Sequence, residues 1–250
     1  MNWLHALILG IVQGCTEFFP ISSSAHLKLV KTWLQLPTGE ETVLFDLACH
    51  LGTLLALIVY FRKDLRDICF IQPKKMAPYL IALAPLVPAY FLLKPIRVWA
   101  SQPQFLSGCL LVTALMLFTP RKLFKRVSEG VSWKDALWIG ALQSVALVPG
   151  ISRSASTIMT GMYRGLTVQK AVRFSFLLSI PAVAGGAFLE LLKVTDHRLT
   201  VIDAVLCGIG FGVSALVGTG VVRFAIPLLE KGAFQPFAWY CLIVSILLTL

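Results

Sequence analysis

The stretch EFFPISSSAHL, at Glu17–Leu27, sets an acid, three serines and a histidine at the end of an apolar segment. That segment runs from about Trp3 to Phe19 and then meets Pro20. Proline lacks the backbone N–H that a helix needs, so it ends or kinks a helix. The stretch therefore predicts two helices joined by a polar break.

The composition of the whole chain indicates where this break lies. Of its 250 residues, 57% are hydrophobic and 14% are charged, and the mean hydropathy is +0.81. A soluble domain carries roughly 25% charged and about 45–50% apolar residues. We therefore expect an all-α polytopic membrane protein that forms one membrane domain over residues 1–250. The net charge of +10 does not indicate a nucleic acid partner, because the basic residues lie in short clusters between apolar runs, as in cytoplasmic loops.

Six apolar runs approach the length of about 17–25 residues that a membrane-spanning helix needs. They lie at about 45–61, 77–93, 105–119, 174–192, 201–222 and 235–250. The sequence therefore predicts six transmembrane helices.

A second broken segment resembles the first. It covers about 136–148 and turns polar within VPGISRSAST, at Val148–Thr157. A broken helix at membrane depth is tolerated only inside protein or beside a wet cavity. Both segments are therefore predicted to be re-entrant helical hairpins, which enter the bilayer and return.

The two hairpins form an internal repeat. At an offset of 130 residues, eight of the 21 residues between Ala6 and His26 are identical in the second segment. Three predicted spans separate the hairpins, and an odd number of crossings turns the second copy upside down. We expect an inverted-topology repeat, with repeat 1 at about 1–120 and repeat 2 at about 130–250, whose polar tips meet near the midplane. Most basic residues fall in the loops of one side, which predicts that this side is cytoplasmic and that both termini lie outside.

The positions at which the two copies differ hold residues suited to chemistry. Three such pairs are Glu17 and Leu147, Ser23 and Arg153, and His26 and Ser156. Symmetry is thus kept in the scaffold and broken where a substrate would be handled.

Glu17 is an acid within an apolar segment, where a charge is costly unless it is paired or solvated. Three roles are open to Glu17: to cap the next helix, to pair with an arginine, or to take part in the reaction. Gln13 lies four residues earlier on the same helical face, so the two could hold a divalent cation through oxygen ligands. One carboxylate and one amide make a weaker site than two acids.

Ser22, Ser23 and Ser24 follow the break, and a serine N-cap explains one of them. Ser23 lies three residues before His26, on one helical face. A hydroxyl near a histidine and a carboxylate is the arrangement of an activated nucleophile. Ser23, His26 and Glu17 are therefore candidate catalytic residues, with a packing role for His26 left open.

Arg153 follows a Pro-Gly pair within a membrane segment and needs an anion there. Glu17 or a bound phosphate would serve, and the planar fork of a guanidinium suits phosphate. Backbone N–H groups at the start of the following helix would complete an anion cradle. The hydroxyls available to it are those of Ser22, Ser24, Ser152, Ser154, Ser156 and Thr157.

Other polar residues are less informative. Asp46 and His50 lie four residues apart at the start of the first predicted span. They either face a cavity inside the protein, or they cap the helix and extend their polar ends to the membrane surface. P-loop, CxxC, HExxH and GxGxxG motifs are absent from the sequence, so no nucleotide or zinc site is expected.

At these residues the chain resembles the bacterial undecaprenyl-diphosphate phosphatase family, also called the bacitracin-resistance protein family. The family's first motif, (E/Q)xxxE followed by PxSSxxH, appears as QGCTEFFPISSSAH at Gln13–His26. Its second motif, PGxSRSxxT, appears as PGISRSAST at Pro149–Thr157. The resemblance runs from the N-terminus to the last span, and it departs at Gln13, where many members carry glutamate.

The resemblance implies a hydrolase of the bacterial inner (plasma) membrane that converts undecaprenyl diphosphate to undecaprenyl phosphate and inorganic phosphate, recycling the lipid carrier of cell-wall synthesis. It implies that Ser23 or His26 is the nucleophile. Glu17 would activate it or help to bind Mg²⁺ or Ca²⁺, and Arg153 would grip the diphosphate. Membrane lipids and the polyprenyl diphosphate are the expected partners, and a homodimer is left open. The rival is a lipid-phosphate flippase or transporter that uses the same anion cradle but needs no nucleophile.

Overall fold

Helices form every regular element in the part of the chain that the computed structural model describes, residues 1–36, 40–100, 102–119, 130–192 and 200–249. In chain order they are α1 (Trp3–Thr16), α2 (Ser23–Trp33), α3 (Glu40–Tyr60), α4 (Arg62–Arg66), η1 (Asp67–Ile71), η2 (Pro73–Met76), α5 (Ala77–Leu83), α6 (Leu86–Leu92), α7 (Lys94–Ala100), α8 (Pro103–Phe118), α9 (Trp133–Val145), α10 (Arg153–Tyr163), α11 (Val168–Leu191), α12 (Val201–Glu230) and α13 (Gln235–Leu247). Of the short elements, η1 is a π-helix and η2 a 3₁₀-helix. The all-α class is confirmed.

Four helical stretches are long and apolar enough to cross a membrane: Thr42–Tyr60, Pro73–Leu92, Val168–Leu191 and Val201–Glu230. The pair α7 and α8 is bent by 104° and would add a fifth if it forms one span. The described residues thus support a multi-pass membrane protein with four or five candidate spans, against the six expected.

The expected spans at about 174–192 and 201–222 have different ends in the structure. α11 begins at Val168 rather than near 174, because the Thr167 hydroxyl caps it by accepting the backbone N–H of Lys170 at 3.3 Å. α12 continues past 222 to Glu230, with Pro227 inside it. Apolar periodicity locates a helix better than it locates the polar turn at either end.

The last expected span, 235–250, is shorter than predicted in the described part of the chain. α13 covers 13 residues, and it packs along α8, where the Ser245 hydroxyl donates to the Ser107 carbonyl at 2.8 Å. Neither helix has the 18 residues of a candidate span by itself. Protein contacts, rather than lipid alone, therefore cover part of these two apolar helices.

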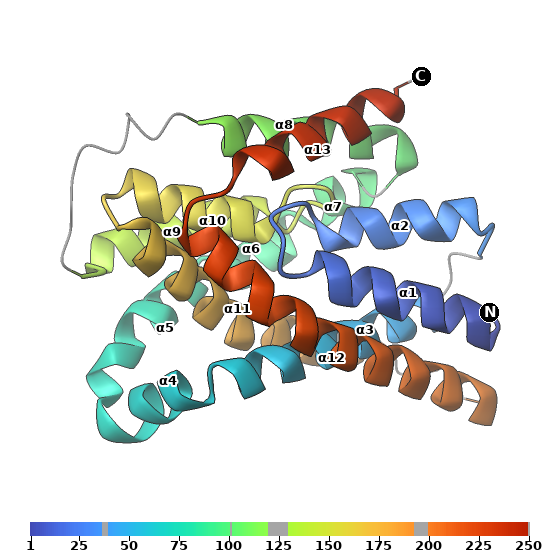
Figure 1. Cartoon of the computed structure of the whole chain (residues 1–250), viewed down its shortest axis with the longest axis horizontal. Helices are drawn as coiled ribbons and strands as arrows, with labels where there is room; N and C mark the ends of the chain where they lie inside the picture. Colours follow the sequence, from blue (N-terminus) through green and yellow to red (C-terminus); the bar gives the residue numbers. More distant parts are fainter. Residues whose placement is uncertain (37–39, 101, 120–129, 193–199, 250) are drawn as a thin grey trace.

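Both predicted helix breaks are present. α1 ends at Thr16 and α2 begins at Ser23, while α9 ends at Val145 and α10 begins at Arg153. In Figure 1 the α1–α2 pair reaches the centre of the molecule from one end and the α9–α10 pair reaches it from the other. The bounds of α10 each lie 130 residues after those of α2, which is the offset of the repeat that the sequence predicts.

Small residues let each hairpin approach its neighbouring helix closely. Gly10 lies against α12, and a Cβ added to it would meet Val213 at 3.0 Å. Its counterpart Gly140 lies against α5, and a Cβ there would meet the Ala82 carbonyl oxygen at 2.2 Å. Equivalent glycines therefore fix both hairpins against the rest of the bundle.

An ion pair closes the open end of the second hairpin. Asp135 lies in a capping box at the start of α9, where the Ser132 hydroxyl accepts its backbone N–H at 3.2 Å. Its carboxylate accepts from Nε of Arg164, at the end of α10, at 2.8 Å. The start of one helix thus lies beside the end of the next, as a helical hairpin requires.

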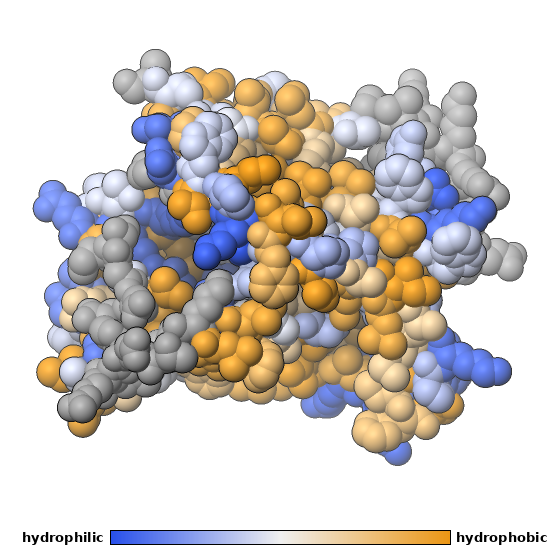
Figure 2. Space-filling view, turned by 180° about the vertical axis from the view of Figure 1, so that it is seen from behind, coloured by the Kyte–Doolittle hydropathy of each residue, from blue (hydrophilic) through white to orange (hydrophobic). Residues whose placement is uncertain are grey.

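Hydrophobic residues cover most of the face seen in Figure 2, and hydrophilic residues gather mainly towards its two ends. Large apolar side chains are exposed on the long helices, among them Leu216 on α12 at 77% and Phe188 on α11 at 61%. Water would not stabilise such a surface, whereas lipid does.

Candidate active site

The two helix breaks line a polar cavity of about 250 Å³. Its lining residues are Glu17, Phe19, Ser22, Ser23, Ser24, His50, Ala146, Leu147, Pro149, Ile151, Ser152, Arg153 and Ser154. All but His50 come from the two breaks and the helix ends beside them. Segments more than 100 residues apart in the sequence therefore build one site.

Glu17 is the centre of the hydrogen-bond network at this cavity. Its side chain is 5% exposed. One carboxylate oxygen accepts from Arg153 Nη2 at 2.6 Å. The other accepts from the Ser23 hydroxyl at 2.6 Å and from the Gln13 amide at 3.0 Å. Because buried charges need partners, these three donors account for the acid within an apolar segment.

The first break holds its serines in an unusual backbone conformation. Ser22 has φ 67° and ψ 86°, in the left-handed region that non-glycine residues seldom adopt. Its hydroxyl makes no capping bond to α2 and lies 3.2 Å from the Ser24 hydroxyl instead. Such strain is concentrated at functional sites, where surrounding contacts maintain it. The short turn brings Ser23, the first residue of α2, within reach of Glu17.

The second break is shaped by α8. The Thr113 hydroxyl donates to the Gly150 carbonyl and accepts the Ser152 backbone N–H, both at 3.0 Å. Gly150 has φ 98°, and a Cβ there would meet the Cβ of Cys109 at 2.4 Å, so the position requires glycine. Ser152 then caps α10 by accepting the Ala155 N–H at 3.3 Å. The cap sets Arg153 at the first turn of α10, facing Glu17.

Hydroxyls from both breaks line the cavity beside Arg153. The hydroxyl oxygens of Ser152 and Ser154 lie 3.2 Å apart, and those of Ser22 and Ser24 in the other copy are separated by the same distance. The Arg153 side chain is 25% exposed, and one of its nitrogens donates to Glu17. A guanidinium has five N–H donors, so others remain for an anion. The cavity can therefore accept an anionic group between a guanidinium and four serine hydroxyls.

Four of the predicted site residues do not line this cavity, and one of them is Ser156, whose hydroxyl donates to the Ser152 carbonyl at 2.9 Å. His26 is buried and turned away from Ser23: Nδ1 lies 2.8 Å from the Ser22 carbonyl and Nε2 lies 2.8 Å from the Tyr240 hydroxyl. Thr157 shares a 2.6 Å hydrogen bond with Ser175. Gln13 lies behind Glu17 and also donates to Thr53 at 3.4 Å. The structure thus brings Glu17, Ser23 and Arg153 together without His26.

A divalent cation would find few protein ligands here. Among the described residues, no group of three or more His, Cys, Asp and Glu side chains could hold a metal ion. One observation does fit a cation: Oε1 of Gln13 is buried and has no hydrogen-bond partner. Magnesium is commonly bound through one or two carboxylates together with substrate phosphates. Glu17 and Gln13 therefore fit a weak cation site that needs the substrate to complete it.

A second cavity, of about 570 Å³, adjoins the first and is mainly apolar. It lies among α3, α5, α6 and α11, and His50 and Leu147 line both cavities. Gly185 and Gly186 form part of its wall, with nothing within 4 Å of a Cβ at either position. A polar chamber and an apolar chamber therefore meet at a shared boundary.

The family described as Bacitracin resistance protein BacA matches residues 6–247. The chain belongs to this family. A relative from Protochlamydia amoebophila, named undecaprenyl-diphosphatase, is 38% identical over 253 residues and covers 100% of this chain and 98% of its own length. Relatives of the same name from Pelobacter propionicus and Rubrobacter xylanophilus are 39% and 36% identical, covering 100% and 96% of the chain and 98% and 94% of their own lengths.

His50, whose role the sequence alone does not decide, lines the candidate active site of this family member. Its Nε2 lies 3.9 Å from the Glu17 carboxylate, while Nδ1 lies 2.8 Å from the Asp46 carbonyl of its own helix. A weak signal was available, because His50 and Thr53 lie three residues apart on one face of an apolar span. That face proves to be the one that meets the first break.

Proposed function

We infer that this protein hydrolyses undecaprenyl diphosphate to undecaprenyl phosphate and inorganic phosphate, and so recycles the lipid carrier of cell-wall synthesis. Membership of the family and the shared name of its curated relatives support this activity. The observation that carries it is that Glu17 accepts hydrogen bonds from a hydroxyl, that of Ser23, and from a guanidinium, that of Arg153, each at 2.6 Å. A hydroxyl donating to a carboxylate beside an anion-binding group is suited to phosphoryl transfer.

Ser23 is the proposed nucleophile. Its oxygen attacks the terminal phosphorus, the bond from that phosphorus to the bridging oxygen breaks, and undecaprenyl phosphate leaves. Glu17 takes the hydroxyl proton, because the two oxygens are 2.6 Å apart. A water molecule then cleaves the Ser23 phosphoester, which releases inorganic phosphate and restores the hydroxyl. His26 is the alternative nucleophile, and its partners Ser22 and Tyr240 favour a positioning role instead.

Arg153 and the serine hydroxyls of the cavity stabilise the charge that develops on the transferred phosphoryl group. Preorganised donors of this kind are usually the largest single contribution to catalysis. A bound divalent cation, Mg²⁺ or Ca²⁺ on Glu17 and Gln13, would add further neutralisation of the diphosphate. Ser22, Ser24, Ser152 and Ser154 are the proposed phosphate ligands that line the cavity, while Thr157 supports α10 through Ser175.

The proposed membrane arrangement follows the sequence prediction of six spans and two re-entrant hairpins in an inverted repeat. The central position of both breaks supports it, with α8 and α13 as the two spans that are short in the described residues. We propose the bacterial inner membrane as the location, with both termini outside. A second subunit is not needed, since one chain supplies every residue that the mechanism uses.

A flippase or transporter is the rival function. A carrier needs the anion cradle but not a hydroxyl bonded to a carboxylate, and the three curated relatives described above carry the name of a hydrolase. We therefore retain hydrolysis alone.

Phosphate release by the purified protein tests both the activity and its cation. We expect release from undecaprenyl diphosphate, a fall of roughly tenfold or more with a chelator, and recovery with Mg²⁺ or Ca²⁺. Absence of phosphate release in every condition would overturn the enzyme assignment. Full activity in chelator would leave the enzyme intact and overturn the cation proposal.

The apolar cavity is the proposed channel for the prenyl chain next to the diphosphate. Gly186→Phe would fill it, since a Cβ at Gly186 has open space around it. We expect kcat/KM for undecaprenyl diphosphate to fall about tenfold or more, because several apolar contacts with the chain are lost. Turnover of a diphosphate with a very short prenyl chain should change little. Gly208→Ala, on α12 and also in open space, is the control, and an equal loss for both substrates would argue against the channel.

A further inference from the structure

Helix α11 changes its surroundings at Pro181, which lies inside it. In 171–180 every residue except Arg173 is buried, whereas in 181–191 only Ala187 is buried. Proline lacks the N–H that would bond to the carbonyl four residues earlier, and a helix bends readily at such a point. α11 therefore consists of an embedded first half and an exposed second half, which meet at Pro181.

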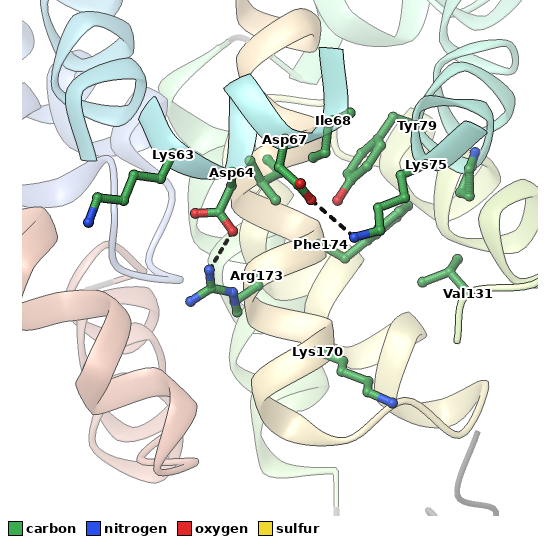
Figure 3. A pocket seen from close by; sticks show the side chains of 12 residues that line it. Lys63, Asp64, Asp67, Ile68, Lys75, Tyr79, Val131, Lys170, Arg173 and Phe174 are labelled. Carbon is green, nitrogen blue, oxygen red and sulfur yellow. Dashed lines mark hydrogen bonds and ion pairs between the residues drawn. The ribbon is translucent and has the colours of Figure 1, made fainter. Parts of the chain in front are cut away.

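Side-chain contacts fix the first half of α11. Figure 3 shows Arg173 paired with Asp64 of α4, at 2.5 Å, beside a third cavity of about 760 Å³. Tyr79 of α5 stacks on Phe174 in the same view, with ring centroids 4.7 Å apart. Nη1 of Arg173 also lies 3.9 Å from a carboxylate oxygen of Glu230, on α12. These contacts tie the first half to α4, α5 and α12.

The second half of α11 forms part of the wall of the apolar cavity of about 570 Å³, and α6 forms another part. Val87 of α6 and Phe188 of α11 both line this cavity and are also 62% and 61% exposed. α6 packs mainly on α9, whereas α11 packs mainly on α3 and α10. The cavity therefore reaches the lipid-facing surface through a side opening between α6 and α11.

A hydrogen bond joins the two helices at this opening. The Tyr90 hydroxyl of α6 donates to Oε1 of Glu190, on the second half of α11, at 2.7 Å. Tyr90 is 8% exposed and is held by Arg97 of α7, whose Cζ lies 4.2 Å from the centre of the ring and whose Nη2 donates to the Tyr90 carbonyl at 2.8 Å. We call the pair of Tyr90 and Glu190 the latch, because it joins a fixed side chain to the less embedded half of α11.

The apolar cavity is too small to hold an undecaprenyl chain by itself. Its volume of about 570 Å³ lies in the range of roughly 300–1,000 Å³ that encloses a drug-sized ligand. Most of a prenyl chain bound there must therefore lie outside the cavity, in the bilayer. The side opening between α6 and α11 provides that route.

We propose that the prenyl chain of the substrate passes between α6 and α11, and that the latch closes this passage when no prenyl chain occupies it. Binding separates Tyr90 from Glu190 as the second half of α11 moves about Pro181, while the contacts of the first half stay in place. The latch thus determines how readily a long prenyl chain is accepted. This proposal rests on the proposed hydrolase function and on the prenyl channel.

Tyr90→Phe tests the latch, because it removes the hydroxyl and keeps the ring. Binding of a long prenyl chain then no longer breaks a hydrogen bond to a carboxylate, so we expect KM for undecaprenyl diphosphate to fall roughly three- to tenfold with kcat unchanged. KM for a diphosphate with a very short prenyl chain should not change. Tyr79→Phe is the matched control, since it removes a hydroxyl from α5 beside the fixed half of α11, and it should alter KM for neither substrate.

Hydrogen exchange of the full-length protein in detergent, followed by mass spectrometry, gives a readout that does not depend on activity. We expect the amides of 182–191 to exchange about threefold or more faster in Tyr90→Phe than in the unaltered protein, and those of 171–180 to exchange at the same rate. Tyr79→Phe should leave both segments unchanged.

Unchanged exchange of 182–191 in Tyr90→Phe would overturn the proposal, as would a KM for undecaprenyl diphosphate that stays the same or rises. An equal fall of KM for the short-chain substrate would also overturn it, because the latch would then not act on the prenyl chain. Absence of phosphate release by the unaltered protein would instead overturn the enzyme assignment, and the exchange of 182–191 would still decide whether the latch restrains α11.

Discussion

Arg153→Ala is expected to lower phosphate release from undecaprenyl diphosphate by about a hundred- to a thousandfold, the cost of removing one preorganised donor from a transition state. The variant loses the guanidinium that lies 2.6 Å from Glu17 and borders the cavity. The loss should appear in kcat as well as in kcat/KM, because charge on the phosphoryl oxygens develops mainly during transfer. Arg153→Lys should recover only part of the activity, since a point charge replaces a planar fork.

Stability must be separated from catalysis in this experiment, because Arg153→Ala also leaves Glu17 buried with one partner fewer. Arg164→Ala is a matched control. It removes an arginine from the same helical hairpin, where Arg164 pairs with Asp135 at 2.8 Å outside the cavity. We expect Arg164→Ala to lower the thermal unfolding temperature in detergent while keeping near-normal turnover. Near-normal phosphate release by folded Arg153→Ala protein would contradict the assignment of this cavity as the active site.

Ser23→Ala should abolish the phosphoryl-enzyme that a rapid quench would otherwise trap, and reduce turnover by at least about a thousandfold. The Ser23 hydroxyl is the one that donates to Glu17, at 2.6 Å. Ser144→Ala is the control, because Ser144 lies outside the cavity on α9 and its hydroxyl donates to the Gly140 carbonyl of its own helix. It should retain most of the activity and the trapped intermediate.

His26→Ala distinguishes the alternative nucleophile from a positioning role. His26 bonds to the Ser22 carbonyl and the Tyr240 hydroxyl, each at 2.8 Å, so its loss should relax the strained turn before Ser23. We expect a moderate loss of kcat with the phosphoryl-enzyme still formed. Tyr240→Phe removes the same outer hydrogen bond and should reproduce part of that loss. An intermediate that survives Ser23→Ala and disappears in His26→Ala would assign the nucleophile to His26.

Local sequence predicted much of the fold. Apolar runs of sufficient length indicated spans, and Pro20 and the Pro149–Gly150 pair indicated the two breaks, because proline and glycine act on the backbone within one helical turn. Helix ends were less predictable. The beginning of α11 depends on a cap from Thr167, and α13 is a short helix packed on α8. Hydropathy predicts neither the Thr167 cap nor the packing of α13 on α8.

The sequence predicts the residues of the candidate site that lie at the equivalent breaks of the two repeat copies. Glu17, Ser23 and Arg153 stand at positions where the two copies differ, and all three line one cavity. Helical spacing alone places His26 beside Ser23, but a hydrogen bond to Tyr240, 214 residues away, holds the imidazole elsewhere. The sequence does not decide the role of His50, because only its contact with Glu17 distinguishes it from a snorkelling residue.

The sequence by itself determined that this chain belongs in a membrane and that two apolar segments are broken at polar turns, since hydropathy and helix breakers act locally. Only the tertiary structure decided which polar side chains of those turns face one another. Arg153 and Glu17 lie 136 residues apart in the chain and meet at 2.6 Å. The close approach of each hairpin to its neighbouring helix at Gly10 and Gly140 fixes that meeting, because side-chain partners depend on how packed helices cross.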